Sequence, residues 1–151
     1  MGVRISGQLL LIVAPAAALA SLDLLVKHIV PTAAWALHHR SNAWVACCMI
    51  LLLAAVGLSL VPSRAVAFAG GVMSAGVLGN LVSARSDGNW VPNPLTISHG
   101  DYTLAFNLAD VFFLLGNLLL MTALMVVAVQ QRGRFAAPRA WERELVRRLR
   151  S

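Results

Sequence analysis

The residues of this chain that could do chemistry are few, and they lie within apolar sequence. In the stretch AFNLADVFFLLGN, Asn107 and Asp110 stand one helical turn apart at the start of an otherwise almost wholly apolar run. Asn80 and the pair Asp23 and Lys27 are also polar residues inside apolar runs. A positioned carboxyl group can act as a general acid or base. The role of the Asp110 carboxylate is therefore the first question that the sequence raises.

The elements that carry these residues are predicted to be membrane-spanning helices. Of the 151 residues, 59% are hydrophobic and 12% are charged, and the mean hydropathy is +0.77, which excludes an ordinary soluble domain. Stretches of about 18 to 23 residues without charge are long enough to cross the hydrocarbon as helices. We predict an all-α integral membrane protein whose domain, residues 1–131, has four transmembrane helices near 5–30, 43–61, 65–84 and 104–131, followed by a basic cytoplasmic tail, residues 132–151.

The distribution of arginine indicates an orientation. Nine of the twelve Lys and Arg residues fall on one side of the predicted bundle: Arg4, Arg64, Arg132, Arg134, Arg139, Arg143, Arg147, Arg148 and Arg150. Loops and ends rich in Lys and Arg stay in the cytoplasm, so we predict that both termini are cytoplasmic. The net charge of +6 then reflects topology and an affinity for anionic membrane lipid. We expect no nucleic-acid partner.

Three of the predicted helices bring polar residues to one depth. At a rise of about 1.5 Å per residue, Asp23, Asn80 and Asp110 lie roughly 24 to 33 Å above the cytoplasmic boundary. Asp23 and Lys27 are four residues apart and can pair. Polar residues in a span face the bundle interior or a wet cavity, because facing lipid is expensive. We therefore predict a shared polar pocket near the outer leaflet.

Small residues on the third helix predict close packing. Gly71, Ala75 and Gly79 recur at four-residue spacing, the pattern that lets membrane helices approach backbone to backbone. We expect these three residues to have a structural role, which is to bring Asn80 toward the Asp110 face of the fourth helix.

The histidines do not form a convincing ligand set. His38 and His39 are adjacent, and His28 and His99 are distant in the sequence. Adjacent histidines rarely bind one ion, and no cysteine or carboxylate completes a set of ligands. We expect neither a metal site nor a cofactor.

Taken together, the motifs SLDLLVK, AGVLGNL, AFNLAD and LLGNLLL resemble those of signal peptidase II, the lipoprotein signal peptidase. That family consists of aspartic proteases of the bacterial cytoplasmic membrane, and the resemblance covers most of the chain. The segment from Phe106 to Asp110 fits the family motif Phe-Asn-x-Ala-Asp at every fixed position. The resemblance implies that Asp110 is one of two catalytic aspartates and that Asn80 and Asn107 line the substrate site.

The second catalytic aspartate of the family has no counterpart here. Pro92 stands at the place where the resemblance puts it. An aspartic protease needs two carboxyl groups that share a proton, one acting as base and the other as acid. Asp101 is a speculative replacement because it closely precedes the fourth helix, and Asp87 is a weaker candidate.

The resemblance, with this departure, leads to one expectation and two alternatives. We expect a signal peptidase II-like protein of the bacterial cytoplasmic membrane with an outer-leaflet pocket for lipid-modified prolipoprotein signal peptides, and with weak or absent cleavage. Alternatively, the protein is an active aspartic endopeptidase that uses Asp110 and a replacement acid. A third possibility is a non-catalytic subunit of a membrane complex.

Overall fold

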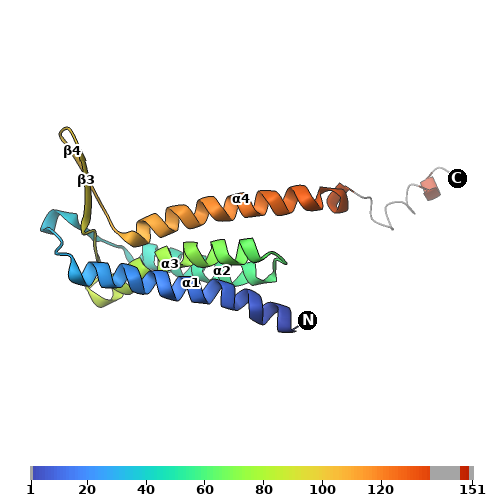
Figure 1. The fold of residues 1–151 in the computed structure, drawn as a ribbon, viewed down its shortest axis with the longest axis horizontal. Coiled ribbons are helices and arrows are strands. Elements are labelled where there is room, and N and C mark those ends of the chain that lie inside the picture. The colour runs from blue at the N-terminus through green and yellow to red at the C-terminus, as the bar shows by residue number, and fades with distance from the viewer. Residues whose placement is uncertain (1, 137–146, 150–151) are drawn as a thin grey trace.

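The structure, a computed structural model, describes residues 2–136 and 147–149. Most of these residues are helical, and four helices are long and apolar enough to cross a membrane. The elements follow in the order α1 (Gly2–Ile29), η1 (Ala34–Ala36), β1 (Leu37–His39), α2 (Asn42–Gly57), η2 (Leu58–Leu60), α3 (Arg64–Ser86), β2 (Trp90–Pro92), β3 (Leu95–His99), β4 (Tyr102–Phe106) and α4 (Leu108–Ala136). The start of α1 and the end of α4 lie at one end of the bundle, and the strands lie at the other (Figure 1).

The four predicted helices are present, but the all-α prediction is incomplete. Two short antiparallel pairs, β1 with β2 and β3 with β4, lie at one end of the bundle. The fourth helix begins at Leu108 and not near 104, because Tyr102–Phe106 forms β4. It continues to Ala136, past the predicted end at 131. The rest of the predicted tail lies mainly outside the described residues.

Two of the helices begin at serine caps. The Ser41 side chain accepts a hydrogen bond from the backbone N–H of Trp44 at 3.2 Å, and Ser63 accepts one from Val66 at 3.4 Å. Each bond satisfies a first-turn N–H group that has no partner within the helix. The caps therefore fix where α2 and α3 start.

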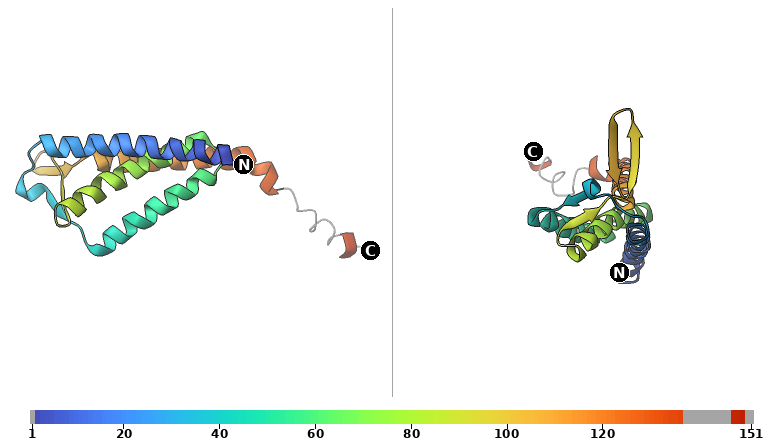
Figure 2. Two further views of the ribbon diagram at one scale, coloured as in Figure 1. Left: turned by 90° about the horizontal axis from the view of Figure 1, so that it is seen from below. Right: turned by 90° about the vertical axis from the view of Figure 1, so that its left-hand side faces the viewer.

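Helix α3 occupies the centre of the bundle. In the most apolar 18-residue stretch of α3, 78% of the stretch is buried inside the protein. In the corresponding stretches of the other three helices, at most 22% is buried. Helices α1 and α4 make most of their contacts with α3, and α2 lies against another side of it (Figure 2). Exposed apolar side chains such as Leu53 and Leu114 cover the outer helices. This distribution suits a bundle surrounded by lipid, in which only the central helix is shielded by protein.

Glycines set the distance between the helices. A Cβ on Gly71 would lie 2.6 Å from the carbonyl oxygen of Ile12 in α1. A Cβ on Gly76 would collide with the backbone of α4, and one on Gly116 would collide with the backbone of Met73 in α3. Within the predicted small-residue face, Gly71 thus serves the contact with α1 and Gly79 lies between Asp23 of α1 and Ala109 of α4, while Gly76 and Gly116 form the contact between α3 and α4.

The strands form the end of the bundle opposite to the start of α1 and the end of α4 (Figure 1). Strand β1 pairs with β2 so that Leu37 is opposite Pro92. The backbone bonds from Arg40 N to Asn89 O and from Asn93 N to Ala36 O lie on either side of this pairing. Hydrogen-bonded and non-hydrogen-bonded pairs alternate in an antiparallel ladder, so Pro92 occupies a non-hydrogen-bonded position where its missing N–H removes no bond.

Replacing Gly116 by alanine should destabilise the protein, because the added methyl group meets the α3 backbone. We expect a loss of about 1 to 3 kcal/mol, the usual cost of overpacking, measured as a lower midpoint of thermal unfolding in detergent. Gly133→Ala is the matched control on the same helix, because a Cβ there has no neighbour within 4 Å. Equal midpoints for the two variants would contradict the proposed close approach of α3 and α4.

Candidate functional site

A chain of polar contacts joins three helices at the strand end of the bundle. Lys27 Nζ lies 2.7 Å from Asp23 Oδ2 and donates a hydrogen bond to Asn80 Oδ1 at 2.8 Å. Asn80 Nδ2 in turn donates to Asp110 Oδ1 at 2.9 Å. The predicted pairing of Asp23 with Lys27 is therefore confirmed, as is the convergence of Asn80 and Asp110.

Asp23 also holds the start of α4. Its Oδ1 atom accepts a hydrogen bond from the backbone N–H of Ala109 at 2.8 Å, and the residue is fully buried. Ala109 is in the first turn of α4, where N–H groups lack partners within the helix and where a negative charge is favoured. A Cβ on Gly79 would lie 2.5 Å from Asp23 Oδ2. Gly79 thus makes room for the carboxylate, and Ala75 on the same helix is also fully buried.

Asn107 and Asp110 cap α4 reciprocally. The backbone N–H of Asp110 donates to Asn107 Oδ1 at 2.9 Å, and the backbone N–H of Asn107 donates to Asp110 Oδ2 at 3.2 Å. Asn107 directly precedes the helix and Asp110 is its third residue, which is the arrangement of a capping box. The two residues that suggested a catalytic motif therefore also have a clear role in starting the helix.

The buried amide of Asn93 completes the support of Asn107. Asn107 Nδ2 donates to Asn93 Oδ1 at 2.6 Å and to the Pro92 carbonyl oxygen at 3.2 Å. Asn93 Nδ2 lies 3.0 Å from His38 Nδ1 and 3.4 Å from the carbonyl oxygen of Ala105. Sequence reasoning missed Asn93, which is 2% exposed. Its position between two prolines resembles an ordinary turn, and nothing in its local sequence indicates burial.

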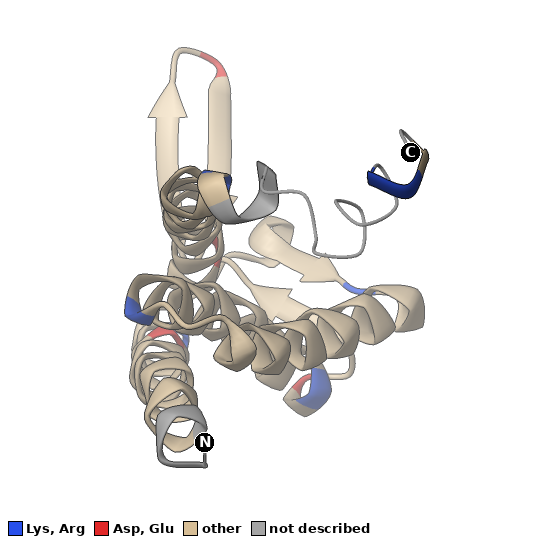
Figure 3. Cartoon of the chain, turned by 90° about the vertical axis from the view of Figure 1, so that its right-hand side faces the viewer, with Lys and Arg blue, Asp and Glu red and all other residues tan. Residues whose placement is uncertain are grey.

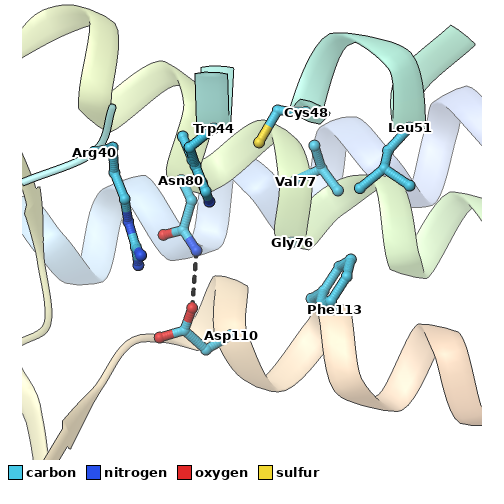
Figure 4. Close-up of a pocket in the computed structure, with 9 residues that line it drawn as sticks. All are labelled: Arg40, Trp44, Cys48, Leu51, Gly76, Val77, Asn80, Asp110 and Phe113. Atoms are coloured by element: carbon cyan, nitrogen blue, oxygen red, sulfur yellow. Dashed lines mark hydrogen bonds between the residues drawn. The ribbon is translucent and has the colours of Figure 1, made fainter. Parts of the chain in front are cut away.

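A cavity of about 140 Å³ opens beside this network. Its lining comes from α2, α3 and α4 and from Arg40, two residues before α2: Arg40, Trp44, Cys48, Leu51, Gly76, Val77, Asn80, Asp110 and Phe113. Arg40, Asn80 and Asp110 lie toward one end of the lining, and Leu51 and Phe113 lie toward the other (Figure 4). The Arg40 guanidinium carbon is 5.1 Å from the centre of the Trp44 ring, a cation–π distance. The cavity therefore has a polar end and an apolar end, as a site for an amphiphile would.

Among the residues that the structure describes, Asp110 is the only carboxylate in the lining of this cavity. Asp23 is separated from it by Lys27 and Asn80 in the chain of contacts. Asp101 is exposed in the turn between β3 and β4. Tyr102, next to the turn, and Phe106, at the base, are four positions apart in extended strand β4, a length of about 13 Å. The structure thus does not bring the predicted replacement acid Asp101 to Asp110.

The other positions considered for a second acid line a different cavity. This second cavity, of about 220 Å³, is bordered by Asp87, Pro92, Lys27 and His28 among others. Asp87 follows α3 and is exposed there. The Pro92 carbonyl oxygen accepts a hydrogen bond from Asn107 Nδ2, so Pro92 lies beside the polar network. Neither residue contributes a carboxylate to the cavity that Asp110 lines.

The histidines of the first loop have neighbours that are not metal ligands. His38 contacts Asn93, and His39 packs edge-to-face on Trp90 with 5.1 Å between ring centres. Across residues 2–136 and 147–149, no three His, Cys, Asp or Glu side chains are arranged to hold a metal ion. The described residues that line the cavity thus supply one carboxylate, one guanidinium and the amide of Asn80, together with the Cys48 thiol and the Trp44 indole.

Comparisons with known proteins assign no family or function to this chain. No family model, no curated protein and no solved structure matches the chain. The relationship to signal peptidase II stays a prediction that depends on the sequence motifs.

Breaking the buried ion pair should destabilise the bundle strongly. Lys27→Met leaves Asp23 buried without its cation, which typically costs about 3 to 5 kcal/mol. Asp23→Asn keeps an oxygen acceptor for Ala109 N–H, so the double variant with Lys27→Met should recover much of this loss. Unfolding midpoints in detergent measure both effects.

Asp101→Asn is the control for removing a carboxylate charge, because Asp101 is exposed at the hairpin turn. A surface substitution of this kind should change stability by no more than about 0.5 kcal/mol. A double variant no more stable than Lys27→Met alone would contradict the role given to the ion pair.

Proposed function

We propose that this protein is a signal peptidase II-like membrane protein that binds lipid-modified prolipoprotein signal peptides and cleaves them weakly or not at all. The main support for this proposal is one observation on the cavity. The cavity next to Asp110 is polar at one end and apolar at the other, and the described residues of its lining include a single carboxylate. An acylated peptide has the same two-part character, with apolar chains beside a polar backbone.

The proposed place of the site is the outer surface of a bacterial cytoplasmic membrane. The start of α1 and the end of α4 lie at one end of the bundle (Figure 1), whereas Lys27, Asn80 and Asp110 lie close to the opposite ends of their helices. Most of the basic residues fall on the side of the termini in the sequence-based topology, and the positive-inside rule would place that side in the cytoplasm. Substrates exported across the membrane would then meet Asp110 from the outer leaflet.

Weak or absent cleavage follows from the surroundings of Asp110. Peptide hydrolysis by an aspartic protease needs one carboxylate to activate water and a second carboxyl group to protonate or polarise the carbonyl. Asp110 Oδ1 accepts from Asn80, and Oδ2 accepts from the backbone of Asn107. Arg40 at the polar end of the cavity can bind a carbonyl or an anion, but it does not supply the second carboxyl group that this mechanism needs. These groups therefore favour binding of the peptide without its cleavage.

Filling the apolar end of the cavity should weaken ligand binding. Leu51→Trp enlarges a side chain in the cavity lining, and we expect the Kd for a synthetic diacylglyceryl-modified signal peptide to rise at least about tenfold, or 1.4 kcal/mol. The measurement is fluorescence titration in nanodiscs. Leu53→Trp is the matched control on α2, because Leu53 is 71% exposed and lies outside the cavity lining. Equal affinities for the two variants would exclude this cavity as the binding site.

Cleavage is tested separately by mass spectrometry of a lipidated prolipoprotein mixed with the purified protein. We expect the signal peptide to remain attached over hours. Release of the peptide that disappears in Asp110→Asn would instead support the active endopeptidase, and Asp101→Asn and Asp87→Asn would then identify the second acid. Failure to bind the lipidated peptide, together with copurification of a defined membrane complex, would support a non-catalytic subunit.

A further inference from the structure

The hairpin of β3 and β4 has two chemically different faces. Its strands pair from Leu95 opposite Phe106 to His99 opposite Tyr102, and successive side chains of a strand point to opposite faces. One face therefore carries Leu95, Ile97, His99, Tyr102, Leu104 and Phe106. The other face carries Thr96, Ser98, Thr103 and Ala105. The hairpin is amphipathic across its thickness.

Over most of its length, the apolar face is not covered by the other residues that the structure describes. Ile97 is 61% exposed, Leu104 is 66% exposed and Tyr102 is 84% exposed. On the polar face, Ser98 Oγ and Thr103 Oγ1 form a hydrogen bond of 2.9 Å. An isolated two-stranded hairpin is marginally stable in water and needs a surface on which to bury its apolar side. This hairpin therefore requires a partner for its apolar face.

The hairpin is set crosswise to the helices, with its two faces turned along the direction in which the helices run (Figures 1 and 2). Seen from the side of the bundle, the hairpin lies across the direction of the helices and its strands are nearly edge-on (Figure 1). Seen along the bundle, both strands show their broad faces and extend beyond the outline of the helices (Figures 2 and 3). One face of the hairpin is thus turned toward the side on which the helices extend, and the other is turned away from it.

The hairpin is also continuous with the outer surface of α4. Strand β4 ends at Phe106, and α4 begins two residues later at Leu108. Val111, Leu114 and Leu118, close to this end of α4, are exposed apolar residues on a helix long and apolar enough to span a membrane. The bilayer that surrounds α4 would therefore extend beneath the hairpin.

We propose that the hairpin lies flat on the bilayer beside α4, with its apolar face in the interface between headgroups and acyl chains. Ile97 and Leu104 enter the acyl region, and Tyr102 lies at headgroup level, where amphipathic aromatic rings collect. Asp101, the one charged residue in Leu95–Phe106, stays in water or among the headgroups at the tip. Ser98 and Thr103 face the aqueous side. This anchoring does not depend on the function proposed for the cavity.

Nitroxide scanning of the two faces tests the proposal in lipid vesicles. Single cysteines replace Ile97 or Leu104 on the apolar face and Ser98 or Thr103 on the polar face, in a Cys47→Ala, Cys48→Ala background of unchanged helix content. The protein is reconstituted into vesicles of phosphatidylcholine and phosphatidylglycerol, and collision rates of each label with oxygen and with a water-soluble nickel complex are measured. Oxygen concentrates in acyl chains, whereas the nickel complex stays in water.

The labels at Ile97 and Leu104 should show an oxygen-to-nickel collision ratio at least about threefold higher than the labels at Ser98 and Thr103, as for one face buried in an interface. Equal nickel access on both faces would overturn the proposal and place the hairpin in water. Shielding of Ile97 from both oxygen and nickel would also overturn it, in favour of a protein partner or a second copy.

Amide hydrogen exchange gives a readout without labels, in case a nitroxide disturbs the hairpin. In vesicles, the double variant Ile97→Asn, Leu104→Asn should speed exchange of the amides in residues 95–106 at least about tenfold, the effect expected for a locally stabilised unit that loses its apolar contact. The matched polar-face variant Ser98→Asn, Thr103→Asn should change exchange much less. Equal effects of the two variants would count against a lipid-facing side.

Discussion

The buried ion pair between Asp23 and Lys27 is the constraint on which the arrangement of the other polar residues depends. Two charges removed from water are stable only if additional hydrogen bonds satisfy their remaining atoms. Here the carboxylate takes a backbone N–H from α4, and the ammonium group donates to Asn80 on α3. Two helices distant in the sequence must therefore approach α1 at the level of this pair.

The central helix permits that approach because it is lined with small residues. Gly79 leaves space for Asp23, and Gly76 allows the α4 backbone to pass close to α3. Asn80 follows Gly79 directly, so the residue that links Lys27 to Asp110 lies where the helices are nearest. The position of Asp110 results from packing as much as from its own hydrogen bonds. A bulkier α3 would separate the carboxylate from the polar chain even with every polar residue retained.

The sequence was sufficient to predict the helices and the central contacts, because both depend on regular geometry. Gaps between charges located the spans, four-residue spacing paired Asp23 with Lys27, and a fixed rise per residue brought Asn80 to the depth of Asp110. The strands were missed because a short apolar run such as residues 102–106 has no period that separates a buried helix from a strand. Asn93 was missed because its burial depends on contacts with His38 and Asn107, which are remote or irregularly placed in the sequence.

The segment Phe106 to Asp110 illustrates how far a motif alone supports a function. A capping box requires a polar residue before the helix and an acid three positions later, which is the same spacing that suggested a catalytic motif. Capping alone could therefore account for Asn107 and for one oxygen of Asp110. The cap does not account for the other oxygen, which is directed to Asn80 at the edge of the cavity. The two oxygens thus have different contacts: Oδ2 takes part in the cap, and Oδ1 is joined to Asn80, which also lines the cavity.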